Sequence, residues 1–72
     1  MTQEDTLAGA ARHFKECEQR LARQQKRVDL LEQSSYPDLT KEARVVRALL
    51  EEALLAARQR LRAERLARGL PD

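Results

Sequence analysis

The sequence predicts an all-α fold, an antiparallel two-helix hairpin that dimerises into a four-helix bundle. Three observations predict it: apolar residues recur with heptad spacing in two long segments, a single proline-containing break separates these segments, and helix-forming residues dominate the composition. The chain has 72 residues, 36% of them charged, with two glycines and two prolines. We therefore expect residues 1–72 to form one helical hairpin.

The first helix is predicted over about residues 4–33, because heptads counted from Leu7 place apolar side chains at both core positions. These positions are Leu7, Phe14, Leu21 and Val28 on one line, and Ala10, Cys17, Gln24 and Leu31 on the other. Gln24 is the polar exception. We expect it either to pair across a dimer axis or to extend toward solvent, and to fix the register of the helices.

A turn is predicted at about residues 34–39, where a Ser-Ser-Tyr-Pro-Asp stretch interrupts the pattern. Pro37 disfavours a helical conformation at the residue before it. The second helix is predicted over about residues 40–68, with Thr40 preferred to Asp38 as its N-cap.

The second helix is predicted to end at Gly69, which can take the left-handed conformation, and Pro71 cannot continue it. Its inner face is predicted to consist of Leu39, Ala43, Val46, Leu50, Ala53, Leu54, Ala57 and Leu61. An antiparallel register follows from the short turn. The expected layers are Leu31 with Ala43, Val28 with Val46, Gln24 with Leu50, Leu21 with Ala53, Cys17 with Ala57, and Phe14 with Leu61.

Charges of opposite sign lie on the matching flanks of the two helices. The flank of the first helix carries Glu4, Glu18 and Glu32, and that of the second carries Arg44, Arg47, Arg58 and Arg65. Glu32 is expected to reach Arg44 or Arg47, and Glu18 to reach Arg58. Such exposed pairs select the register more than they stabilise the fold.

A second apolar line on the second helix lies beside the inner face and is not used by the hairpin itself. It consists of Val45, Leu49, Ala56 and Ala63. A short hairpin completes its core most simply by packing this line against a second copy. The predicted function is that of a non-enzymatic interaction protein, a homodimer that presents a helical surface to a protein partner.

The alternative is a small RNA- or DNA-binding regulator that uses an arginine line on the second helix. This line consists of Arg44, Arg47, Arg58, Arg62 and Arg65, and the first helix adds Arg12, Lys15, Arg23, Lys26 and Arg27. The line is long enough to follow a phosphate backbone, but Glu51 interrupts it, no aromatic residues interleave for base stacking, and the net charge is only +2. The competing interpretation is a solvated, salt-bridged surface.

The sequence predicts no catalytic, metal or cofactor site. His13 and Cys17 share one side of the first helix, but two ligands are only half of a metal site and the chain has no other histidine or cysteine. The acidic residues are spread along the helices, so they do not form a catalytic cleft. With one cysteine and no apolar stretch long enough to span a membrane, we expect a cytoplasmic protein without membrane contact.

The chain resembles short bacterial helical-hairpin proteins that have no established activity. The resemblance in the first helix rests on Arg12, His13, Phe14, Glu16, Glu18, Arg20, Arg23, Gln24, Val28 and Leu31. In the second helix it rests on Thr40, Glu42, Ala43, Leu50, Glu51, Glu52 and Leu54. It covers about two-thirds of the chain and implies the same hairpin fold. Those proteins usually have a small residue where Cys17 stands, which argues against a cysteine-dependent role.

Overall fold

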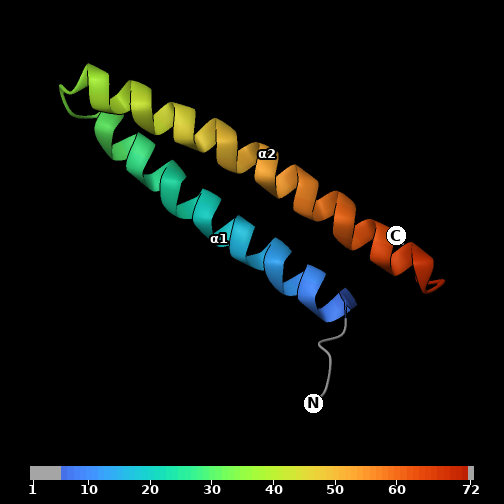
Figure 1. Cartoon of the computed structure of the whole chain (residues 1–72). Helices are drawn as coiled ribbons and strands as arrows, with labels where there is room; N and C mark the ends of the chain where they lie inside the picture. The colour runs from blue at the N-terminus through green and yellow to red at the C-terminus, as the bar shows by residue number, and fades with distance from the viewer. Residues whose placement is uncertain (1–5, 72) are drawn as a thin grey trace, which may run out of the picture.

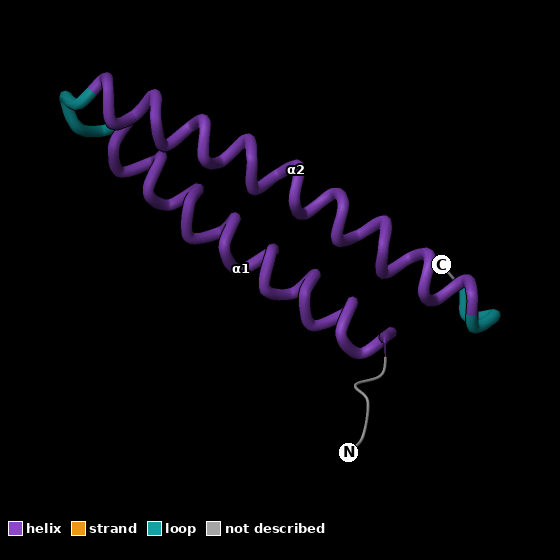
Figure 2. The backbone as a smooth tube through the Cα atoms, viewed as in Figure 1, coloured by secondary structure: helices purple, strands orange, loops and turns teal. Residues whose placement is uncertain are grey.

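The computed structural model describes residues 6–71 and consists of two long antiparallel helices, α1 (Thr6–Glu32) and α2 (Pro37–Ala67). Figure 1 shows the helices side by side, with the turn at one end of the hairpin. Loop segments lie at this turn and after α2 (Figure 2). This confirms the predicted all-α antiparallel hairpin. The predicted helix start at residue 4, and Glu4 itself, lie outside the described residues.

α1 turns its predicted stripe toward α2 along its whole length. All eight predicted core positions are buried or half-buried, and Val28 is 0% exposed. Cys17 is buried as predicted. Gln24 is half-buried and behaves in neither of the two expected ways, because its Nε2 donates to the carbonyl oxygen of Ala43 on α2 at 2.8 Å.

The turn is shorter than predicted, because α2 begins at Pro37 and the connection covers only residues 33–36. The predicted N-cap at Thr40 is wrong: the N-cap is Tyr36, which makes no side-chain capping hydrogen bond. Pro37 takes the first helical position, where its missing N–H costs nothing. Thr40 lies inside the helix instead. Its Oγ1 is 3.1 Å from the carbonyl oxygen of Leu31 and 2.8 Å from that of Tyr36.

α2 faces α1 with a stripe that differs in part from the predicted one. The buried or half-buried residues of α2 are Thr40, Ala43, Arg47, Leu50, Leu54, Ala57, Leu61 and Glu64. Five of the eight predicted inner residues are among them, but Leu39, Val46 and Ala53 are exposed. Thr40 and Arg47 stand one position further along the chain and take the places predicted for Leu39 and Val46. In this rotation of α2 the Thr40 hydroxyl contacts the carbonyl oxygen of Leu31.

The register also differs from the predicted one, by about one helical turn. Leu31 accepts from Thr40 rather than facing Ala43, and Gln24 bonds to Ala43 rather than facing Leu50. The short connection is the physical reason, since it brings each residue of α1 opposite a residue nearer the start of α2. At the open end, Thr6 Oγ1 donates to Glu64 Oε2 at 3.0 Å.

The end of α2 follows the prediction. Gly69 has a φ of 72°, in the left-handed region, and donates its N–H to the Leu66 carbonyl at 3.0 Å. Leu70 donates to the Arg65 carbonyl, also at 3.0 Å. This pair of bonds is a Schellman motif, which satisfies carbonyls left open at a helix C-terminus.

Candidate interaction surfaces

The predicted second apolar line remains open to solvent in the hairpin. Val45 and Leu49 are 56% and 59% exposed, and Ala56 and Ala63 are also exposed. The rotation of α2 places three further apolar residues beside this line: Leu39, Val46 and Ala53. The unpartnered apolar surface of α2 is therefore wider than predicted. We call the predicted residues Val45, Leu49, Ala56 and Ala63 the outer apolar line.

Polar side chains occupy part of the inner surface of the same helix. Thr40 is buried, and Arg47 and Glu64 are half-buried, all on the stripe that faces α1. Within residues 6–71, every buried side-chain nitrogen or oxygen has a hydrogen-bond partner, so these groups are satisfied where they lie. Thus α2 turns polar side chains toward α1 while Val45, Val46 and Leu49 remain exposed.

Two members of the predicted arginine line are already paired near the turn. Arg44 forms an ion pair with Glu32 at 3.3 Å, which confirms one of the predicted pairs. Arg47 lies 3.5 Å from Glu51 and donates to Gln25 Oε1 at 3.3 Å. These contacts reduce the charge that this half of the line offers to phosphates.

The other three arginines gather at the open end of the hairpin. Arg58, Arg62 and Arg65 line a depression of about 460 Å³ beside Phe14. Arg65 Nε donates to the Pro71 carbonyl at 3.2 Å, and Arg62 also has an interaction partner. The line is therefore divided into a paired half and a clustered half rather than forming one continuous track.

The predicted pair of Glu18 and Arg58 is not formed. The two side chains border the same depression between the helices, but no ion pair joins them in the part of the chain that the structure describes.

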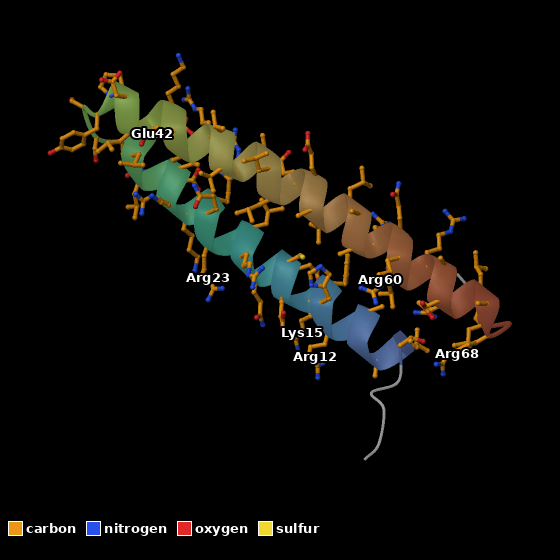
Figure 3. The ribbon with its side chains drawn as sticks, viewed as in Figure 1. Arg12, Lys15, Arg23, Glu42, Arg60 and Arg68 are labelled. Carbon is orange, nitrogen blue, oxygen red and sulfur yellow. The ribbon has the colours of Figure 1, made fainter. Side chains whose placement is uncertain are left out.

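The first helix carries a basic site that the sequence interpretation found only in part. Four cations border a depression of about 800 Å³ along α1: Arg20, Arg23, Lys26 and Arg27. In Figure 3, Arg23 extends from α1 on the side away from α2, as Arg12 and Lys15 do. The sequence pattern predicts Arg23, Lys26 and Arg27 as basic residues of this helix, but it does not group Arg20 with them. The heptad pattern could have placed Arg20 and Arg27 together, because both directly precede α1 core residues.

His13 and Cys17 lie close together on α1. Cys17 Sγ is 3.7 Å from His13 Nε2, with the sulfur buried and the histidine exposed. Among residues 6–71, no group of three histidine, cysteine or carboxylate side chains comes together around a point where an ion could bind. Neither described helix is apolar over a stretch long enough to cross a bilayer.

Comparison with known proteins identifies no family for the chain. No family model, no curated protein and no solved structure matches it.

Proposed function

We propose that this protein is a non-enzymatic interaction module that forms a homodimer through the outer apolar line of α2 and presents the remaining helical surfaces to a protein partner. One observation carries the proposal: α2 leaves Val45 and Leu49 more than half exposed while it turns Thr40 and Arg47 inward. A helix that met only α1 would gain stability from the opposite arrangement.

The hairpin core is too thin to favour an isolated chain. The buried apolar residues are three alanines, one cysteine and one valine: Ala10, Cys17, Val28, Ala43 and Ala57. Fully burying a valine or leucine that was exposed contributes about 1.5–3 kcal/mol. Covering Val45 and Leu49 would therefore add stabilisation that the small side chains of this core do not supply, and small domains commonly obtain it by association.

The order of side chains along the outer apolar line suits a second copy. Its large members, Val45 and Leu49, lie toward the turn, and its small members, Ala56 and Ala63, lie toward the open end. When two α2 helices pack antiparallel about a two-fold axis, Leu49 of each copy faces Ala56 of the other, and Val45 lies about one helical turn from Ala63. A large side chain then meets a small one on both sides of the axis, as close packing requires.

The test is the mass of the protein in solution at micromolar concentration. Light scattering should give twice the 8.3 kDa mass of the chain, and Leu49→Glu should give the single-chain mass. Because both copies carry the buried charge, the substitution should raise the dimer dissociation constant by at least about a hundredfold. The matched control is Leu30→Glu, which places the same charge at an exposed leucine of α1 and should leave the dimer intact.

Two results would contradict the proposal. One is a stable wild-type monomer, and the other is a Leu49→Glu protein whose mass and melting curve equal those of the wild type. A loss of mass in both variants would show that assembly depends on general surface charge rather than on the outer apolar line.

A further inference from the structure

One depression of the hairpin lies along α1 and does not include the outer apolar line of α2. Its volume is about 800 Å³, and Leu50 is the α2 residue that lines it. Leu30, Leu31 and Leu50 supply its apolar surface, and Leu30 is 65% exposed. Its cations are Arg20, Arg23, Lys26 and Arg27, and no carboxylate lines it. We call this site the basic depression.

The side chains of the four cations in the basic depression have no partner among the residues that the structure describes. In residues 6–71, none of the four side chains donates a hydrogen bond or forms an ion pair. Asp29 and Glu18 are the acidic residues nearest to them in sequence, and Asp29 accepts from Gln25 Nε2 at 2.9 Å. Arg44 and Arg47 of α2, by contrast, are held by Glu32 and Glu51. The basic depression is therefore where the hairpin has uncompensated positive charge beside apolar surface.

The spacing of these cations defines the shape of an occupant. Arg20, Arg23 and Arg27 recur at intervals of three and four residues, so they lie on one side of α1 over about 10 Å of its axis. An occupant that meets all of them runs along α1 and brings several negative charges. It also needs apolar side chains that cover Leu30, Leu31 and Leu50.

An amphipathic helix with acidic residues beside its apolar stripe satisfies both requirements. Its apolar side chains at helical spacing would cover Leu30, Leu31 and Leu50, and its carboxylates would pair with the guanidinium groups, whose planar shape favours two-point contact. A nucleic acid would bring phosphates, but it has no apolar side chains for the leucines, and the depression contains no aromatic residue for base stacking. We infer that the basic depression docks an acidic amphipathic helix of a partner protein, an inference that rests on the proposed interaction role and names the chemistry of the partner.

The test uses a labelled synthetic helix of about 20 residues, long enough to be partly helical in water, with leucines on one stripe and glutamates flanking it. Its binding to the intact protein is measured by fluorescence anisotropy. Arg23→Glu combined with Arg27→Glu should weaken binding by at least about tenfold, because both guanidinium contacts become repulsive. The matched control combines Lys15→Glu with Lys41→Glu, which changes the net charge equally at exposed residues outside the depression. It should weaken binding by less than about threefold, through screened long-range charge alone.

A second measurement locates the bound peptide. In amide chemical-shift mapping, the largest changes should fall in residues 20–31 and at Leu50. Leu30→Glu should weaken binding while keeping the dimer mass, and Leu49→Glu should abolish the dimer while keeping peptide binding. These two variants distinguish failure of this inference from failure of the proposed dimer.

Several outcomes would overturn the inference. The first is an equal loss in the two double variants, which would indicate general charge attraction. The second is equal affinity for a peptide in which glutamine replaces every glutamate. The third is tighter binding of a duplex or single-stranded oligonucleotide, or of vesicles containing anionic lipid, in competition with the peptide at the same salt concentration.

Discussion

The two helices of the hairpin use their apolar residues differently. α1 buries or half-buries all eight residues of its heptad stripe, including Gln24, and leaves one large aliphatic side chain, Leu30, exposed. α2 turns Thr40, Arg47 and Glu64 toward α1 and leaves a broad apolar surface open. The difference shows that periodicity selects the buried face of a helix only when the helix has a single apolar stripe. α2 has two adjacent apolar stripes, so the turn and the surface of α1 determine which face of α2 is buried.

The largest effect is expected from a charge on the buried stripe of α1, because the difference between the two helices depends on this stripe being buried. Val28 is 0% exposed, so Val28→Glu buries an unpaired carboxylate or opens the centre of the helix pair. We expect a loss of roughly 3 kcal/mol or more in the free energy of unfolding, measured by urea titration at fixed protein concentration.

Leu30→Glu is the matched control, because it places the same charge two residues away on the exposed side of α1. It should change the free energy of unfolding by less than about 0.5 kcal/mol. Similar losses for the two variants would mean that α1 does not have one buried and one open side.

A smaller effect is expected where the turn sets the rotation of α2. Thr40→Val keeps the shape of a buried side chain but removes the hydroxyl that contacts the carbonyl oxygens of Leu31 and Tyr36. We expect a loss of about 1 kcal/mol in the free energy of unfolding. The control is Ser34→Ala, which removes an exposed hydroxyl bond to Leu30 and should have almost no effect. Equal effects would show that the Thr40 hydroxyl does not hold the rotation.

The sequence predicted α1 well because its signal comes from one uninterrupted heptad pattern. The end of α2 was equally clear, since Gly69 and Pro71 act through local backbone geometry. The start of α2 could not be chosen locally, because proline is favoured at a first helical position and threonine is also a good N-cap. Because α2 begins at Pro37 rather than near residue 40, the turn length, the register and the inner face of α2 all differ from the predicted ones.

The sequence predicted the outer apolar line, but it predicted neither the basic depression nor the division of the arginine line. The outer apolar line was found because it depends on α2 alone, and its residues are exposed in the hairpin. The basic depression was missed as a unit because it needs Leu50 of α2 beside cations of α1. The division of the arginine line was missed for the same reason, since the partners of Arg44 and Arg47 include Glu32 and Gln25 on the other helix.

The smallest expected effect concerns the ion pair of Glu32 with Arg44, which joins the helices beside the turn. Both side chains are about half exposed, at 43% and 53%, so the pair itself should contribute about 0–1 kcal/mol. Glu32 is also the last residue of α1, where a negative charge is unfavourable against the helix dipole. Glu32→Gln should therefore change the free energy of unfolding by less than about 0.5 kcal/mol, because the lost attraction and the relieved repulsion oppose each other.

A double-mutant cycle with Arg44→Gln isolates the attraction between the two side chains, and Glu52→Gln serves as an exposed control elsewhere on α2. The coupling energy should lie below about 1 kcal/mol and should decrease as salt is added. A larger coupling that persisted at high salt would mean that this ion pair, rather than burial and the Thr40 hydroxyl, orients α2. The exposure of Leu39 and Val46 would then be a consequence of charge pairing at the turn, and the two helices would differ in their electrostatics rather than in their number of apolar stripes.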